Sequence, residues 1–552
     1  MLLLITTPPQ MHSLANDYYD WRNRTFPVLA SDQGLHTWDH LIADYSSAAV
    51  AKNRAHVHDV SEKVRAIDTA GWKKDDVIDA ILLRSQLARD DFYGRVMRPE
   101  ETDPQVYVRE ASDAIFSLLK KEYAAPEVRA RAATKRLQKV PALLEQGKKN
   151  LTEPVGLYAD FAIDSARSID SLFDTIDTLA GNLSPAEKEE LAAAKKKATV
   201  AMHDYADWLA ARLSTMKAWK PLGKENYEFM LREILLLPLS ADEVEELGRI
   251  ELARYRAHEA MLKDPSMADP DPRRAGVIPK DQADFLSRYQ SRQEEMIRFL
   301  KENRIVTLPD YLGPFLIKQL PEAFKPTSPG GFMNPPGLYD ADSSGFYFIP
   351  TYNPNSRNFY IRAAIEDPRP ILGHEGIPGH FLQLSIANHL KDEIRRQQGD
   401  SVFIEGWALY GEEMLTRTGL YPHDSAAAAQ VLRLSRYRAA RIGVDVNLHT
   451  GRWPFEQAVT YFMEAGGLDR EAATGEAAGA ASSPTQKISY ITGKWQIMQL
   501  LGRYRDMKGA AYRIGDFHDE LIAHGSLPVS VLEWIILDDP TSLEKATGKK
   551  LK

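Results

Sequence analysis

The most informative stretch of the chain is Ile371-Leu-Gly-His-Glu-Gly-Ile-Pro-Gly-His-Phe-Leu-Gln383. It holds two histidines, His374 and His380, with Glu375 directly after the first. The surrounding pattern is helical, but Pro378-Gly379 interrupts it: proline lacks an amide donor and disfavours helical geometry at the residue before it, and glycine permits unusual dihedral angles. We therefore expect a local bulge between the two histidines.

The histidine spacing differs from the H-E-x-x-H motif of zincins. In that motif the two histidines lie about 40° apart on one helical face, so both reach one zinc ion while the glutamate polarises the bound water. His380 follows His374 by six positions, which in a regular helix would place it about 240° around the axis. The expected bulge would bring His380 back to the side of His374.

A carboxylate further along supplies a third donor. Glu405 comes 25 residues after His380, a gap that allows a second helix to return beside the first and complete a His₂Glu site with water as fourth ligand. Two isolated histidines would more often satisfy a polar core, but Glu375 and Glu405 favour a metal site. Glu412 lies two helical turns beyond Glu405 and could orient a ligand histidine, although an exposed helical glutamate is the favoured interpretation.

The composition limits which partners and which metal ligands the chain can have. The chain has 552 residues, no cysteine, a formal net charge of -8, 44% hydrophobic and 26% charged residues. These values are typical of a soluble globular protein and argue against nucleic acid as a partner. Without cysteine, a metal ion must be held by histidine and carboxylate side chains.

The sequence also bears on location. No window approaches the roughly 18 apolar residues of a membrane span, so we expect none. The apolar start Met1-Leu-Leu-Leu-Ile5 is too short for the core of a signal peptide, although it could be the remnant of a trimmed leader. The location stays open between exported or periplasmic and cytoplasmic, with export slightly favoured.

The chain up to about residue 300 shows helical periodicity with clear start signals. Ser184-Pro185-Ala186-Glu187 and Ser240-Ala241-Asp242-Glu243 are both typical of helix N-termini. We expect residues 1–320 to form a helical region that is one wall of a cleft. Residues 321–552 would form the catalytic region with the zinc site, and the two parts would be one intertwined unit.

Proline, glycine, asparagine and aspartate crowd together between Pro321 and Pro370, which excludes a continuous helix. Within this region Phe346–Ile349 and Asn358–Arg362 are aromatic and β-branched, and we expect them to form a small antiparallel pair that offers an edge strand to a peptide. Residues 472–483 are rich in small side chains and predict a loop. The expected fold is mostly α: a multi-helical, cleft-bearing, metallopeptidase-like fold with a small antiparallel β element near the active site.

Three motifs together carry a family resemblance: His374-Glu-Gly-Ile-Pro-Gly-His380-Phe-Leu-Gln, Glu405-Gly-Trp-Ala-Leu-Tyr and Ser489-Tyr490-Ile-Thr-Gly493. They resemble the bacterial DUF885 family, a group similar to zinc metallopeptidases of the gluzincin type, at least from Pro321 to Arg503. The resemblance implies a mostly α peptidase fold with His374, His380 and Glu405 as zinc ligands and Glu375 as general base. The family often has a second histidine directly after the motif histidine, where this chain has Phe381.

Two further segments have open interpretations. Arg441, Asp445 and His449 follow one another at steps of four on one helical face, where they could form a surface salt-bridge ladder. Equally, Asp445 could orient a neighbouring side chain and His449 could stabilise a developing oxyanion. Tyr490 stands beside Gly493, which leaves room for substrate or backbone, and we favour a functional role for this tyrosine.

The sequence predicts an enzyme, a zinc metallopeptidase with one Zn²⁺ per chain that hydrolyses peptide bonds in short unstructured peptides. Its catalytic residues would be Glu375, His449 and Tyr490. One alternative is a zinc hydrolase of a non-peptide amide or ester, and another is a non-catalytic, metal-containing helical binding protein. The chain contains neither a G-x-S-x-G motif nor a phosphate-binding P-loop, so serine and nucleotide mechanisms have no support. Oligomeric state stays open.

Overall fold

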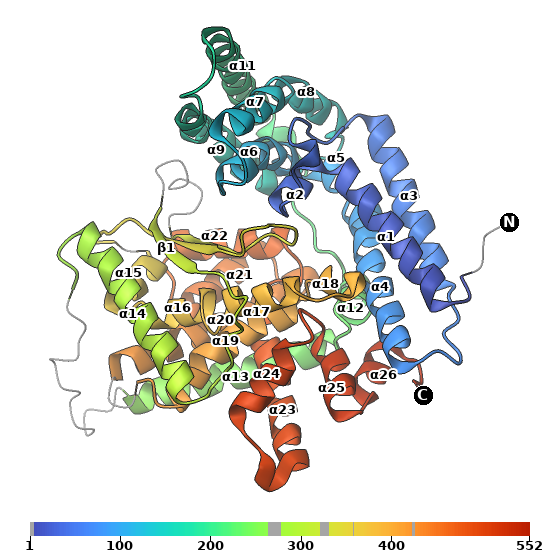
Figure 1. Cartoon of the computed structure of the whole chain (residues 1–552), viewed down its shortest axis with the longest axis vertical. Coiled ribbons are helices and arrows are strands. Elements are labelled where there is room, and N and C mark those ends of the chain that lie inside the picture. The colour runs from blue at the N-terminus through green and yellow to red at the C-terminus, as the bar shows by residue number, and fades with distance from the viewer. Residues whose placement is uncertain (1–4, 263–277, 321–329, 357, 422–424, 552) are drawn as a thin grey trace. The chain divides into compact units, whose positions relative to one another are not determined.

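A computed structural model describes residues 5–262, 278–320, 330–356, 358–421 and 425–551 (Figure 1). The chain is mostly helical with one small sheet, which confirms the expected fold class. It divides into two compact units: one holds the described residues up to Trp219 together with Gly337–Asp342, and the other holds the remaining described residues from Lys220 onward.

The first unit is built from eleven helices within the described residues. They are α1 (Pro8–Thr25), α2 (Pro27–Asp32), α3 (Ser47–Arg65), α4 (Lys74–Phe92), α5 (Pro99–Thr102), α6 (Gln105–Leu119), α7 (Pro126–Leu137), α8 (Val140–Asn150), α9 (Gly156–Arg167), α10 (Asp170–Asp174) and α11 (Pro185–Ala210). Helices α6 to α11 share one continuous apolar core. The start of α11 is the expected capping box, in which Ser184 and Glu187 each accept the other's backbone amide.

The second unit contains the helices and strands around the histidine motif. They are α12 (Lys224–Phe229), α13 (Ala241–Leu262), α14 (Gln282–Glu302), β1 (Phe315–Gln319), β2 (Phe332–Asn334), β3 (Gly345–Ile349), α15 (Phe359–Glu366), α16 (Arg369–Glu375), α17 (His380–Asn388), α18 (Glu393–Arg396), α19 (Ser401–Arg417), α20 (Ser425–His449), α21 (Phe455–Tyr461), α22 (Arg470–Ser482), α23 (Ser489–Lys508), α24 (Ile514–Ile522), α25 (Val529–Leu537) and α26 (Thr541–Thr547). Short 3₁₀ and π-helical turns extend several helices in both units.

The division lies near residue 220, a hundred residues before the boundary expected at 320. Helices α13 and α14 precede residue 320, yet they pack against α20 and α16 of the region that carries the histidine motif. The approach of α13 to α20 is close, because a Cβ atom at Gly248 would lie 2.6 Å from Cγ2 of Ile442. Such long-range packing leaves no local signal in the sequence.

The sheet is mixed, and its middle strand is β3. Strand β1 runs parallel to β3 and β2 runs antiparallel to it, so that Tyr347 of β3 lies between Ile317 and Met333. The strand expected at Phe346–Ile349 is confirmed. Because β3 has a neighbour on each side, the expectation that it offers an edge to a peptide is wrong; β1 and β2 are the edges among the described strands.

The strand expected at Asn358–Arg362 is also wrong, since α15 begins at Phe359. Oδ1 of Asn358 accepts the amide of Ile361, as a helix N-cap does. Ile361, Ala364 and Ile365 are buried at the spacing of one helical face. A short apolar run such as residues 358–362 fits either a strand or a helix. Here it is helical because the helix buries Ile361, Ala364 and Ile365 on one face.

The loop expected at residues 472–483 is wrong, because α22 covers most of this segment. Ala473, Ala477 and Ala480 are fully buried, and α22 packs against α20 and α21. Alanine has the highest helix propensity, and its small side chain allows close helix packing. The small residues of this segment therefore form a buried helix rather than a loop.

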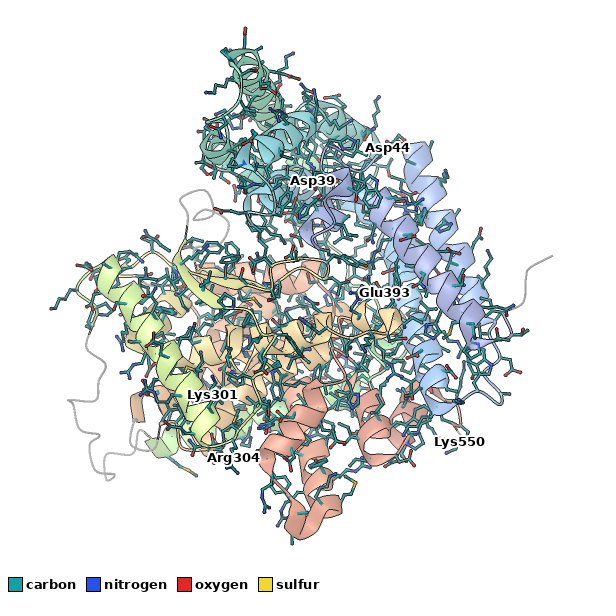
Figure 2. The ribbon with its side chains drawn as sticks, viewed as in Figure 1. Asp39, Asp44, Lys301, Arg304, Glu393 and Lys550 are labelled. Atoms are coloured by element: carbon teal, nitrogen blue, oxygen red, sulfur yellow. The ribbon has the colours of Figure 1, made fainter. Side chains whose placement is uncertain are left out.

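Helix α14 shows how charge is placed at a helix end. Lys301 lies in its last turn and Arg304 just beyond it (Figure 2), near the carbonyl groups that carry partial negative charge. The amide of Ile305 donates to the carbonyl of Leu300, which closes the end of the helix. Cations at this position stabilise the helix terminus.

Helices α19 and α23 approach until their backbones touch. A Cβ atom at Gly493 of α23 would lie 1.8 Å from the carbonyl oxygen of Val402, and one at Gly406 of α19 would lie 2.5 Å from Cα of Gly493. Gly493 was expected to leave room for substrate or backbone, and it leaves room for backbone. This contact fixes α23, which carries Tyr490, against α19, which carries Glu405 and Glu412.

We predict that Gly493→Ala lowers the melting temperature of the protein strongly. The added methyl group would meet the backbone of α19, and overpacking of this kind costs about 1–3 kcal/mol or more. Gly502→Ala on the same helix is the matched control, because a Cβ atom there would meet nothing within 4 Å. That control should be neutral or stabilise slightly; equal melting temperatures for the two variants would contradict the tight contact.

Candidate functional site

The two histidines lie on either side of a helix break. His374 is in the last turn of α16 and His380 is the first residue of α17, so the interruption separates two helices instead of forming a bulge within one. Gly379 makes the close turn possible, because a Cβ atom there would lie 1.9 Å from the carbonyl oxygen of His374. Nε1 of Trp407 donates to the carbonyl of Pro378 at 2.8 Å and ties the turn to α19. The imidazole ring centres end 4.6 Å apart.

Glu405 of α19 completes a three-residue donor set. Its Oε2 atom lies 3.5 Å from Nε2 of His374 and 3.5 Å from Nε2 of His380. Both histidines are more than nine-tenths buried. The structure thus brings together all three ligands that the sequence predicted.

The spacing of these donors fits a metal ion. Donors held about 2.0–2.2 Å from a tetrahedral zinc ion lie about 3.4 Å from one another, whereas a charge-assisted hydrogen bond is about 2.7–2.9 Å long. Oε2 of Glu405 is buried and makes no hydrogen bond within the described part of the chain. A buried carboxylate oxygen aimed between two imidazole nitrogens is the donor arrangement that zinc takes in proteins.

The charges of the set support one another. Burial disfavours the charged form of Glu405, but His374 and His380 more than offset it and hold the pKa of Glu405 well below its usual range. Burial and Arg438 lower the pKa of His374, yet Glu405 and Glu412 outweigh them and raise it to about 9. A proton on His374 therefore helps to balance the carboxylates, and a bound metal cation would take its place.

Glu412 corrects one expectation. It is fully buried, not exposed, and its Oε1 atom lies 2.8 Å from Nδ1 of His374. Arg438 of α20 places Nη1 2.9 Å from the same carboxylate. Burial raises the pKa of Glu412, but Arg438 and then His374 bring it below the usual value, so it is a charged acceptor that can orient the His374 ring. Its spacing from Glu405 was the signal for this role; Arg438 gave no signal in the sequence.

Tyr490 also lies against His374. The two rings stack with centres 6.2 Å apart and planes 15° apart, and the Arg438 guanidinium lies 5.5 Å from the centre of the Tyr490 ring. Tyr490 is half-buried, and its hydroxyl accepts a hydrogen bond from Gln486. The structure therefore brings Tyr490 to the donor set, as the sequence predicted.

Glu375 is half-buried at the end of α16, directly after a donor histidine. Burial is the first cause of the raised pKa of Tyr347 on β3, and the nearby Tyr289 and the Glu375 carboxylate add to it. The Glu375 carboxylate is thus near enough to Tyr347 to affect it, and Glu375 directly follows the donor His374 in the chain.

His449 lies elsewhere in the unit. It is buried, its Nε2 atom lies 2.9 Å from the carbonyl oxygen of Ala480, and its ring stacks on Tyr227. Asp445 is also fully buried, so the surface salt-bridge ladder is wrong. These contacts hold His449 against α22 and Tyr227 and give no support to an oxyanion role.

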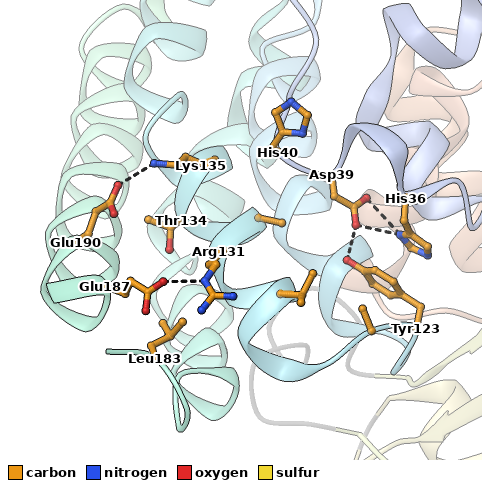
Figure 3. A pocket seen from close by; sticks show the side chains of 13 residues that line it. His36, Asp39, His40, Tyr123, Arg131, Thr134, Lys135, Leu183, Glu187 and Glu190 are labelled. Carbon is orange, nitrogen blue, oxygen red and sulfur yellow. Dashed lines mark hydrogen bonds and ion pairs between the residues drawn. The ribbon is translucent and has the colours of Figure 1, made fainter. Parts of the chain in front are cut away.

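The first unit contains a pocket of about 720 Å³ between the segment around Asp39 and helices α7 and α11 (Figure 3). The charged side chains that line it pair with one another: Arg131 with Glu187, Lys135 with Glu190, and Asp39 with His36, while Tyr123 donates to Asp39. We assign no function to this pocket because these charges already satisfy each other.

A family model described as "Bacterial protein of unknown function (DUF885)" matches residues 27–536. The chain belongs to the DUF885 family. No curated protein matches the sequence. Within the described residues, none of the helices has the length and apolar character needed to cross a membrane.

Two solved structures share the fold. A putative lipoprotein of unknown function from Shewanella oneidensis is 21% identical with a TM-score of 0.75, and the match covers 97% of this chain and 100% of that one. A putative lipoprotein from Colwellia psychrerythraea is 18% identical, also with a TM-score of 0.75, over 99% of this chain and 100% of that one. At these identities the likeness shows the fold alone.

We predict that the protein binds zinc at His374, His380 and Glu405, and that replacing any one of them by alanine abolishes most of this binding, because each would supply one of three donors. Elemental analysis after dialysis measures zinc per chain, with circular dichroism to check folding. His258→Ala, a half-exposed histidine on α13, is the control and should keep its zinc. Full zinc content in His380→Ala would show that the donor set is wrongly assigned.

Proposed function

We propose that the chain is a gluzincin-like zinc metallopeptidase that hydrolyses peptide bonds in short unstructured peptides. The observation that carries this proposal is the donor set of His374, His380 and Glu405, with the spacing a zinc ion requires. Glu375 adds a carboxylate beside the set that is not one of the donors. A protein that only stores a metal needs donors but no base, so Glu375 favours catalysis.

Zinc bound at these donors would act as a Lewis acid that lowers the pKa of water from ~15.7 towards ~7 and polarises a carbonyl group. The residues of the chain would do the rest. Glu375 would accept the proton of the attacking water and return it to the leaving amine. Glu412, held by Arg438, would fix the orientation of the His374 ring. Tyr490 is our candidate for donating a hydrogen bond to the developing oxyanion.

Two other functions use the same donor set. A zinc hydrolase of a non-peptide amide or ester would need the same base, and parallel assays on peptides and small amides distinguish it. A metal-containing binding protein would not need Glu375. The two solved structures described above are named putative lipoproteins, which supports a proposed export of this chain.

We expect Glu375→Gln to keep its fold and its zinc but to lose peptidase activity, because the amide cannot accept a proton. Loss of a general base commonly costs about 10²–10⁴-fold in rate. Mass-spectrometric product mapping on a mixed peptide library measures activity, and Glu366→Gln on the neighbouring α15 is the control. Activity within a few-fold of the parent would remove Glu375 from the mechanism.

The burial of the donors leads to a prediction about substrate size. Since His374 and His380 are only 4% and 8% exposed, a scissile carbonyl must leave its own fold to reach them. We expect short peptides to be cleaved and a native globular protein to be left intact. A peptide length series, compared with folded and unfolded forms of one protein, tests this. Efficient internal cleavage of the long unfolded chain would contradict the size limit while leaving the zinc mechanism untouched.

A further inference from the structure

A cluster of charged side chains lies beside the candidate metal site and has no part in the proposed mechanism. The guanidinium of Arg441 lies 5.1 Å from the centre of the Tyr490 ring, and that ring stacks on His374. Nη2 of Arg441 lies 3.2 Å from both oxygens of Glu476 on α22. Nζ of Lys487, just before α23, lies 3.3 Å from Oε2 of the same carboxylate. We call Arg441, Lys487 and Glu476 the cationic cluster.

The cationic cluster places two positive charges on one carboxylate. The Arg441 and Lys487 side chains are only 7% and 13% exposed, so water screens their repulsion weakly. Burial, then Arg441, lowers the pKa of Lys487. Burial opposes ionisation of Glu476, but the two cations outweigh it and bring its pKa to about 2. The ammonium group of Lys487 has three N–H donors and pairs with Glu476, so it can also bind a second carboxylate.

Asp445 is the other acidic group that faces Lys487, and it has a different task. Its Oδ1 atom accepts the amide of Thr485 and the hydroxyl of Tyr227, and its Oδ2 atom accepts the amide of Lys487. Burial raises its pKa, the effect being partly offset by His449 and by these bonds. Asp445 thus fixes the segment that carries Lys487 to α20, and its oxygens are occupied by backbone and hydroxyl donors.

We propose that Arg441 and Lys487 bind a carboxylate group of the peptide substrate, an inference that rests on the proposed peptidase function. A planar guanidinium suits bidentate contact with a carboxylate, and an ammonium group adds a second charged donor. The carboxylate is either the C-terminus of the peptide or an Asp or Glu side chain. The centre of the Tyr490 ring lies 5.1 Å from the Arg441 guanidinium and 6.2 Å from the centre of the His374 ring. Because an extended chain spans about 3.3–3.6 Å per residue, the carboxylate belongs to a residue within about three positions of the scissile bond.

Three peptide libraries test the proposal on the full-length, zinc-loaded protein. One has free C-termini and no Asp or Glu, the second is the same library amidated, and the third is amidated with Asp and Glu included. Removing a charge-assisted contact changes binding by about tenfold or more. We expect the amidated neutral library to be cleaved at least tenfold more slowly, at limiting concentration, than one of the two carboxylate libraries.

The faster library identifies the source of the carboxylate. Lys487→Met should raise KM for that library about tenfold, leave kcat and zinc content nearly unchanged, and have no effect on the amidated neutral library. Lys487→Arg should restore the lower KM, which a purely structural lysine would not require. Lys224→Met, which removes a surface ion pair with Asp242, is the control. Equal cleavage of all three libraries would overturn the carboxylate site and leave the peptidase function standing.

A binding measurement separates the two proposals. N-acetylalanine carries a carboxylate, and N-acetylalaninamide is its neutral match. We expect the first compound to raise the melting temperature of the zinc-loaded protein but not of Lys487→Met, and the second to raise neither. If no library is cleaved but this difference is seen, the peptidase proposal fails and the carboxylate site stands. If both compounds behave alike in wild type, and no library shows a carboxylate preference, the carboxylate site is overturned.

Discussion

The position of α19 is the constraint on which the candidate site depends. One face of this helix presents Glu405 to the two donor histidines and Glu412 to the back of His374. Trp407 on the same helix holds the Pro378 turn, and Gly406 lets the backbone of α23 come into contact. A shift of α19 by one ångström would change every one of these contacts, because packed cores do not deform continuously.

Buried ion pairs between the helices of the second unit require these helices to pack in one arrangement. Removing one partner of a buried ion pair is strongly destabilising, whereas the complete pair costs little. Glu412 is matched by Arg438 and His374, and Lys494 of α23 lies 3.0 Å from both Glu251 and Glu413. These pairs link α13, α16, α19, α20 and α23. The helices that hold the donors are therefore bound by charge as well as by apolar packing.

The unit uses its buried ions in two opposite ways. At Lys494 one cation meets two carboxylates, whereas in the cationic cluster two cations meet one. The first arrangement lies between packed helices and serves as a link. The second lies one aromatic ring away from the donor set, where the ammonium group of Lys487 could bind an additional anion. Location relative to the donors, not charge content alone, distinguishes a structural ion cluster from a candidate binding site.

Local patterns in the sequence determined the fold class of this protein and most residues of the candidate site. Helix periodicity and capping residues such as Ser184 predicted the mostly α fold, because these signals depend on short-range geometry. The resemblance of three motifs to one family implied His374, His380, Glu405 and Tyr490 as residues of one site. Tertiary structure alone decided that Glu412 is buried, that Arg438 and Lys487 lie beside the site, and that His449 is bound to Ala480. It also decided that the segment after Asn358 is a helix. These outcomes depend on which faces of distant helices become buried together, and that choice is made by packing across the whole unit.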